Sequence, residues 1–320
     1  MAPARASDRN QRLRQVCPPG GNRLPGRGGG GGRVGGTVLI SPGPNVGAAL
    51  SVSYQGEPGA YSDEAAQQLF PGIGTVGYPT FAGAAAGVEA GASQAAVLPV
   101  ENSVAGVVQE VSDLLWQHPG LTVVQEHVSP IRHHLLSRGQ EPVRRALSHP
   151  QALAQCASWL ARHQITPIPV HDTAGAARQI AEQTSPGDGA IASRAAAERY
   201  QLQIVASDIA DQPSNRTRFL VVRRSPQSSP STGALKLALG IVAEHRPGGL
   251  AQVLEVFAGQ AVNLTRLDSR PIPEQPFNYR FYLDAEIADA QQLEALLASL
   301  EAATTELRLF GAYPLRIAPD

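Results

Sequence analysis

Residues 52–69, VSYQGEPGAYSDEAAQQL, contain the local pattern on which the fold prediction rests. Val52-Ser53-Tyr54 predicts a short strand, and Gly56-Glu57-Pro58-Gly59 predicts a turn. The residues that follow predict a helix with Ser62 as its N-cap. A strand that passes through a tight turn into a helix is the repeating unit of α/β proteins.

The same alternation continues to residue 222. Short apolar runs predict further strands, and Ala-rich stretches predict helices. The predicted strands are residues 95–99, 121–125, 145–148, 189–192 and 218–222, and the predicted helices are residues 151–163 and 195–200. The sequence therefore predicts an α/β domain over residues 51–223, followed by a linker at residues 224–234 that is rich in Ser, Pro and Gln.

Residues 235–315 repeat strands and helices in a different order. Alternating leucines from Leu235 predict a strand, and the spacing of Leu250, Val253, Leu254 and Phe257 predicts a helix. The remaining predicted segments are a strand at 264–269, a loop at 271–278, a strand at 279–285, a helix around 293–300 and a strand at 307–310. This β-α-β-β-α-β order is ferredoxin-like.

Length and composition limit the classes of protein that fit. A chain of 320 residues predicts two domains, and its 26 basic and 27 acidic residues argue against a general nucleic-acid binder. No stretch of about 18 apolar residues occurs, so a membrane span is not expected. Two cysteines provide no disulfide framework, which favours a reducing, cytoplasmic setting. Residues 1–50 are rich in Gly, Arg and Pro and predict a disordered tail with no folded domain in it.

Three predicted turns concentrate small polar residues. They are Gly56–Ser62, Pro99–Gly106 and Asn215–Phe219. Ser103 with helix-start N–H groups would suit a carboxylate, and Arg218 could add a bidentate clamp. The residues alone leave plain alternatives open, since Ser62 and Ser103 could be caps, Arg218 a surface residue and Glu101 a solvated carboxylate. At this level the sequence indicates a two-domain protein that binds a small anion.

Five motifs taken together resemble prephenate dehydratase, in the order typical of that family. They are Gly56-Glu57-Pro58-Gly59-Ala60-Tyr61-Ser62, Leu98-Pro99-Val100-Glu101-Asn102-Ser103-Val104-Ala105-Gly106, Ser148-His149-Pro150-Gln151-Ala152-Leu153-Ala154-Gln155-Cys156, Ala190-Ile191-Ala192-Ser193 and Asn215-Arg216-Thr217-Arg218-Phe219. Residues 235–315 resemble the ACT regulatory domain of the same enzymes. The resemblance implies a catalytic region of two α/β lobes, similar to a type II periplasmic binding protein, at residues 51–223. It also implies decarboxylating dehydration of prephenate to phenylpyruvate without cofactor or metal.

The resemblance also implies roles for single residues. Thr217 would assist departure of the leaving water, and Arg218 would neutralise a substrate carboxylate. Further residues would line the substrate site, namely Glu101, Asn102 and Ser103 on one side, Ser148, Gln151 and Ser193 from the second lobe, and Ser62 and Phe219 beside them. The family's first motif usually has Thr where this chain has Ala60, so that hydroxyl is missing.

In the family, ACT domains pair between subunits and bind phenylalanine at their interface. By resemblance, the effector site of this chain would include Gly249, Leu250, Asn263, Leu264, Asp268 and Ser269. Gly249 stands where the family usually has Ala, and Asp268 where it usually has Glu. The resemblance implies a homodimer or homotetramer controlled by phenylalanine. Two alternatives remain open, an arogenate dehydratase and a non-catalytic sensor of small anions or amino acids.

Overall fold

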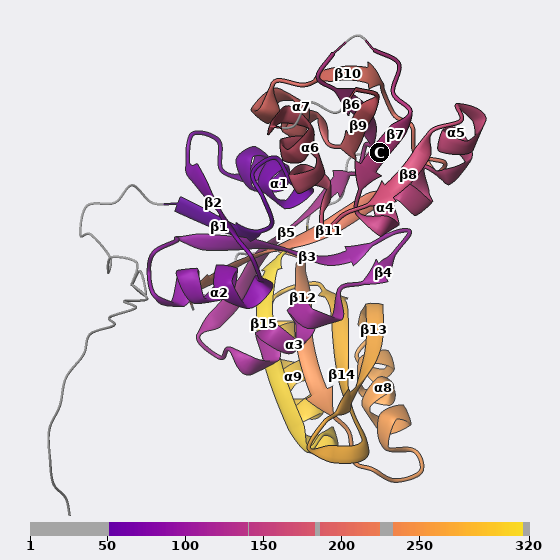
Figure 1. Ribbon diagram of the computed structural model, residues 1–320. Helices are drawn as coiled ribbons and strands as arrows, with labels where there is room; N and C mark the ends of the chain where they lie inside the picture. Colours follow the sequence, from indigo (N-terminus) through magenta and orange to yellow (C-terminus); the bar gives the residue numbers. More distant parts are fainter. Residues whose placement is uncertain (1–50, 140, 183–185, 225–232, 316–320) are drawn as a thin grey trace, which may run out of the picture. The chain divides into compact units, whose positions relative to one another are not determined.

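The computed structural model describes residues 51–139, 141–182, 186–224 and 233–315 (Figure 1). These residues belong to one unit of the chain. The predicted tail at residues 1–50 and most of the predicted linker, residues 225–232, lie outside the described residues.

The first lobe is built on a mixed sheet with the strand order β2-β1-β3-β11-β5, in which β4 also pairs with β3. β1 runs parallel to β2 and β3, whereas β11 runs antiparallel to β3 and β5. The strands are β1 (Ser51–Gln55), β2 (Gly74–Tyr78), β3 (Ala95–Asn102), β4 (Gly106–Val107), β5 (Leu121–Pro130) and β11 (Arg216–Arg224), and the helices are α1 (Tyr61–Leu69), α2 (Phe81–Glu89) and α3 (Gln109–Gln117). Figure 1 shows that β11, which comes from much later in the chain, lies between early strands.

The second lobe is built on a five-stranded sheet with the order β10-β6-β9-β7-β8. Its strands are β6 (His134–Ser137), β7 (Arg145–Ser148), β8 (Thr166–Pro169), β9 (Asp188–Ala192) and β10 (Gln203–Ala206), and its helices are α4 (Pro150–Gln155), α5 (Ala157–Arg162), α6 (Thr173–Glu182) and α7 (Arg194–Tyr200). The chain enters this lobe between β5 and β6 and leaves it between β10 and β11. Two α/β lobes joined by two crossing segments confirm the predicted architecture.

Two local predictions in the lobes are wrong. The predicted helix at residues 151–163 is two helices, because Cys156 leaves the helical conformation at φ −116° and ψ 11°. Ser62 is not an N-cap, since α1 has Ala60 in that position. Asp63 lies inside the first turn of α1, and its Oδ2 accepts a hydrogen bond from the Gly59 N–H at 2.8 Å. Ala60 provides no side-chain cap, and Asp63 instead reaches back from the first turn to a backbone donor just before the helix, at the end where the helix dipole favours a carboxylate.

The C-terminal domain is a four-stranded antiparallel sheet with the order β13-β14-β12-β15. Its elements are β12 (Leu235–Val242), α8 (Gly249–Gly259), β13 (Asn263–Ile272), β14 (Gln275–Ile287), α9 (Ala290–Ala303) and β15 (Glu306–Pro314). The predicted β-α-β-β-α-β order is confirmed, but the predicted loop at 271–278 is mostly strand. Pro271 is tolerated in β13 because this is an edge strand with an irregularity at that point.

One face of this sheet packs on α8 and α9, and the other packs on the first lobe. Tyr282 and Phe310 share a buried cluster with Leu114 and Leu115 of α3. Gly311 lies so close to the Val123 carbonyl that any added Cβ would overlap it, so β15 lies directly against β5. Within the described residues, no helix is both long and apolar enough to span a membrane.

Candidate functional site

Strand β11 presents Thr217 and Arg218 to opposite sides of the first-lobe sheet. Successive side chains of a strand point to opposite faces. Phe219, on the Thr217 side, packs in a buried cluster with residues of α1, whereas Leu220, on the Arg218 side, packs in the cluster that includes α3 and the C-terminal sheet. Thr217 and Arg218 therefore do not face one common substrate site.

Thr217 is held by Asn102, which lies opposite it on β3. The Oδ1 of Asn102 accepts hydrogen bonds from the backbone N–H groups of Val104 at 3.0 Å and Ala105 at 2.8 Å. These two donors fix the orientation of the amide, so Nδ2 must point the other way. Asn102 Nδ2 donates to Thr217 Oγ1 at 2.9 Å. Because Thr217 accepts at its oxygen from Asn102, its own hydroxyl proton is free to be donated to a ligand.

The series of oriented amide side chains continues into the second lobe. Asn102 Nδ2 also donates to Asn215 Oδ1 at 2.8 Å, so the amide of Asn215 is oriented as well. Asn215 Nδ2 then donates to Gln155 Oε1 at 3.0 Å. His133 Nε2 contacts the same Gln155 oxygen at 2.7 Å, and an amide oxygen can only accept a hydrogen bond. This amide network joins the first lobe, both crossing segments and α4.

The network also determines the form of His133. Its Nε2 must carry the proton that is donated to Gln155. The Tyr61 hydroxyl lies 2.7 Å from Nδ1 and 2.9 Å from the Arg132 carbonyl, so these two acceptors share its one proton. Burial lowers the pKa of His133, with a partial opposing effect from the Gln155 hydrogen bond. Burial likewise raises the pKa of Tyr61 well above its ordinary value. Both side chains are therefore neutral at neutral pH.

A pocket of about 350 Å³ lies beside this network. Its lining residues are Val104, Gln151, Ala154, Gln155, Asp211, Gln212 and Asn215. Asp211 Oδ2 accepts a hydrogen bond from the backbone N–H of Ser158 at the start of α5, so one of its oxygens already stabilises the fold. The pocket brings together residues of α4 and of the segment that leads to Thr217. Its lining includes four amide side chains, from Gln151, Gln155, Gln212 and Asn215, and amides can donate to oxygen atoms of a small ligand.

Among the predicted substrate-binding residues, Gln151 lines this pocket, and the others lie in different surroundings. Ser148 is fully buried and donates to the Ile191 carbonyl at 2.6 Å. Ser193 accepts from the Ala196 N–H as the N-cap of α7 and donates to the Gly59 carbonyl at 2.7 Å. Phe219 belongs to the core of the first lobe, and Ser62 is buried in α1.

Ser103 does not present free helix-start amides. Its N–H donates to the Arg216 carbonyl at 2.9 Å, and its hydroxyl accepts from the Arg216 N–H at 2.9 Å. The next two N–H groups are the ones that orient Asn102, and α3 begins only at Gln109. The second motif therefore builds a rigid turn that positions Asn102.

The first motif makes a contact between the lobes. Gly59 has φ +87°, and a Cβ added to it would lie 2.8 Å from the Cα of Ala196 in α7. Tyr200 donates to the Pro58 carbonyl at 2.9 Å, and Arg178 lies 3.5 Å from Glu57. The turn at residues 56–59 thus docks on the second lobe through a position that only glycine fits.

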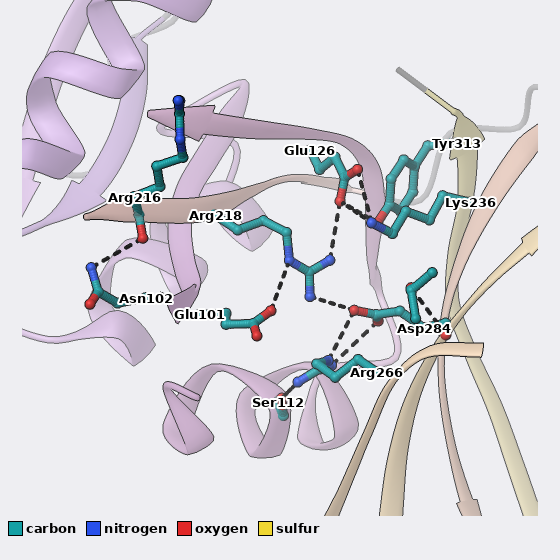
Figure 2. Close-up of polar contacts among 11 residues, drawn as sticks. Glu101, Asn102, Ser112, Glu126, Arg216, Arg218, Lys236, Arg266, Asp284 and Tyr313 are labelled. Carbon is teal, nitrogen blue, oxygen red and sulfur yellow. Dashed lines mark hydrogen bonds and ion pairs between the residues drawn. The ribbon is translucent and has the colours of Figure 1, made fainter. Parts of the chain in front are cut away.

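Arg218 lies on the side of the sheet that faces the C-terminal domain, surrounded by three carboxylates (Figure 2). Its guanidinium is 3.4 Å from Glu101 and 3.1 Å from Glu126, and it makes a close ion pair with Asp284 of β14. Burial lowers the pKa of Arg218, but Asp284 and its other acidic neighbours outweigh this effect and raise the pKa above the ordinary value. Glu101, predicted to line the substrate site, belongs to this cluster.

A second pocket, of about 330 Å³, lies at one end of the C-terminal sheet. Its lining residues are Ala243, Glu244, His245, Arg246, Pro247, Leu250, Asn278, Tyr279 and Phe281. Leu250 is thus at the pocket, and Gly249 lies so close to the Glu244 carbonyl that a Cβ would overlap it. Ser269 is paired with Phe281 in the sheet register.

Asn263 and Leu264 are separated from this pocket within one chain. They pair with Glu286 and Ala285, at the opposite end of β14 from Tyr279. Asp268 is paired with Tyr282 and has a buried Oδ2 without a hydrogen-bond partner among the described residues. The six predicted effector residues therefore form two separate groups in a single chain.

Sequence reasoning did not assign four residues that the structure places in the network: Tyr61, His133, Gln155 and Asn215. Gln155 follows Gln151 by four residues, a helical spacing that puts both on one face and could have indicated it. Nothing local in the sequence indicates His133, because its partners come from α1 and α4. In the described part of the chain, no three His, Cys, Asp or Glu side chains are grouped to hold a metal.

Comparison with known proteins agrees with this geometry. The family model described as prephenate dehydratase matches residues 52–227, and the model of the ACT domain matches residues 238–304. The chloroplastic arogenate dehydratase/prephenate dehydratase 2 of Arabidopsis thaliana is 40% identical over 282 residues, which cover 84% of this chain and 74% of the relative.

Two solved structures are similar over most of the chain. The prephenate dehydratase of Arthrobacter aurescens in complex with L-Phe is 29% identical, with a TM-score of 0.76 over 82% of this chain and 89% of that chain. A structure described as GqqA, a novel type of quorum quenching acylase, is 33% identical, with a TM-score of 0.77 over 83% of this chain and 98% of that chain.

Proposed function

The chain belongs to the prephenate dehydratase family, and from that premise we propose that it converts prephenate into phenylpyruvate, water and carbon dioxide. One observation assigns the departure of the leaving hydroxyl to a particular side chain, Thr217. Asn102 donates to Thr217 Oγ1, which directs the threonine proton away from the protein network. The reaction requires a donor at that kind of position, because a hydroxyl group must leave the ring as water.

The chemistry needs little covalent help from the protein. The ring carboxylate leaves as carbon dioxide, and the electrons of its C–C bond form the aromatic ring while the C–O bond to the hydroxyl breaks. The departing oxygen takes up one proton from the solvent to become water, so the products are phenylpyruvate, carbon dioxide and water. A threonine is too weak an acid to give up its proton fully at the start, so it serves as a positioned hydrogen-bond donor that stabilises the charge developing on the leaving oxygen.

The two substrate carboxylates would be held by donors of the pocket. Arg218 is engaged on the other face of the sheet, so the proposal assigns carboxylate binding to amides. Gln155 uses its carbonyl oxygen for Asn215 and His133, which leaves its Nε2 donors to the pocket that it lines. Gln151 lines the same pocket from one turn earlier on α4.

Turnover of the purified chain with prephenate, and separately with arogenate, tests this proposal. We expect an aromatic keto acid to form from prephenate, detected by its absorbance, at a higher kcat/KM than the reaction of arogenate. A higher kcat/KM for arogenate would mean that the chain is an arogenate dehydratase that uses the same mechanism on an amino acid substrate. No turnover of either compound by folded protein would leave the sensor alternative.

We further propose that phenylalanine controls the enzyme through the ACT domain. The pocket at Leu250 is one half of the effector site, and the separated group at Asn263 and Leu264 supplies the other half from a second copy of the chain. This arrangement favours a homodimer or a larger even-numbered assembly. Light scattering with and without phenylalanine checks it, and a monomer that binds phenylalanine would contradict it. The cytoplasmic location stays a prediction.

A further inference from the structure

We propose that Arg218 is a positioning residue that couples the ACT domain to Thr217, with Asp284 as its partner in the regulatory sheet. The inference rests on the proposed function, because it concerns the regulation of that same site. It assigns to Arg218 a role on the face of the sheet opposite the substrate pocket.

The position of Arg218 in the sheet is the first reason. Thr217 pairs with Asn102, and Arg218 pairs with Glu101, so the two register pairs are consecutive on β11 and β3. The pair that holds the reactive hydroxyl lies on one face, and the ion pair of Arg218 with Glu101 lies directly behind it. The register of β11 against β3 is irregular immediately after Arg218. Such an irregularity bends a strand and re-aims the side chains beside it, so the direction of Thr217 depends on what holds Arg218.

Burial and charge are the second reason. The side chains of Arg218 and Asp284 are 11% and 2% exposed. Lys236 and Arg266 supply two more positive groups, and Glu101 and Glu126 two more negative groups, so the cluster is balanced at three of each sign (Figure 2). Removing one partner of a buried ion pair leaves the other uncompensated, and its side chain then relocates or the interface rearranges.

The connection to the effector pocket is the third reason. Phe281 lines that pocket, and Asp284 lies three residues later on the same strand, β14. Arg266 of β13 donates to Asp284 at 2.9 Å and to Ser112 of α3 at 3.4 Å, so two strands of the regulatory sheet meet the first lobe at this carboxylate. A ligand that displaces β14 at the pocket therefore changes the position of Asp284, and with it Arg218 and Thr217. Coupling along this path requires that a change at Asp284 alters both phenylalanine inhibition and turnover at Thr217.

The test compares Asp284→Asn with Asp113→Asn in the 320-residue chain. Asp113 is a matched control, because it is also a carboxylate of the same interface and binds Arg270 at 2.6 Å and the Tyr282 hydroxyl at 2.7 Å. It lies on α3, however, and both of these partners belong to the C-terminal sheet and not to β11. We measure kcat and KM for prephenate, inhibition by phenylalanine, and phenylalanine binding by calorimetry.

For Asp284→Asn we expect kcat to fall by about 10-fold with KM nearly unchanged, and phenylalanine to bind without inhibiting. For Asp113→Asn we expect lower thermal stability with kcat and inhibition retained. A folded Asp284→Asn protein with the kcat and inhibition of the wild type would overturn the proposal. Equal losses of kcat and inhibition in both variants would also overturn it, because a loosened interface would then explain them.

Two further outcomes are decisive. If Asp284→Asn does not fold, Asp284→Glu keeps the charge but displaces it by one methylene, and we expect weakened inhibition with intact phenylalanine binding. Unchanged inhibition in Asp284→Glu would contradict the coupling. A wild-type protein that does not turn over prephenate would remove the proposed function itself, and this result differs from every outcome seen only in the variants.

Discussion

Asn102 determines what Thr217 can do, because two backbone N–H groups leave its amide only one orientation. In Asn102→Asp the carboxylate can still accept from those N–H groups, but it has no donor for Thr217. The threonine proton would then turn toward the introduced carboxylate rather than toward a ligand. We expect kcat to fall by about 100-fold or more, as is typical when one transition-state donor is lost. Steady-state kinetics check this, and an unchanged kcat in a folded variant would contradict the hydrogen-bond assignment.

At the scale of residues, the sequence could indicate which positions matter but only partly what they do. Thr217 and Asn102 are brought together as the resemblance implies. Arg218 and Glu101 are not with them, because each is adjacent in sequence to Thr217 or Asn102 on its strand and so points to the other face. Knowing that residues 216–224 form a central strand would have separated the two faces. The other partners of Arg218, Glu126 and Asp284, come from β5 and β14, which no local pattern reveals.

At the scale of elements, the turn at residues 56–59 makes a close backbone contact between the two lobes. Gly59→Ala places a Cβ against α7 in addition to the left-handed strain at φ +87°. Gly91→Ala is the matched control, since Gly91 has φ +74° and nothing within 4 Å of an added Cβ. We expect Gly91→Ala to lower the free energy of unfolding by about 1 kcal/mol, and Gly59→Ala by about 2–4 kcal/mol. Chemical denaturation measures both losses. Equal losses would show that α7 moves away from the added Cβ with no further loss of stability.

Elements with strong local patterns were predictable, and those defined by distant contacts were not. The alternating leucines of β12 and the helical spacing of α8 agree with the structure. The break at Cys156 was not predictable, because Gln151–His163 carries no Gly or Pro that would signal it. The strand at 275–278 was missed because Pro276 and the polar residues around it are typical of a loop.

At the scale of the whole molecule, two buried histidines where the chain enters the second lobe make stability depend on pH. Burial lowers the pKa of His133 and of His134 in the folded protein. The unfolded chain therefore binds more protons below an ordinary histidine pKa of about 6.5. The stability that these neutral groups provide is present above that pH and is lost as the pH falls from there toward the lower folded values.

We accordingly expect the free energy of unfolding to decrease from pH 7 to pH 5, and to decrease less in His133→Gln. His171→Gln is the control, because the His171 side chain is 90% exposed. Urea denaturation at the two pH values gives the comparison. The same decrease in His133→Gln and the wild type would show that this histidine is not responsible.

The measurement that tests the account most directly is turnover of prephenate by Thr217→Val beside Thr217→Ser. Valine keeps the shape of the side chain without its hydroxyl, and serine keeps the hydroxyl without the methyl group. The account predicts that Thr217→Val binds prephenate but loses about 100- to 1,000-fold in kcat, while Thr217→Ser stays within about 10-fold of the wild type. Wild-type turnover by Thr217→Val would contradict the claim that this hydroxyl assists the departure of water.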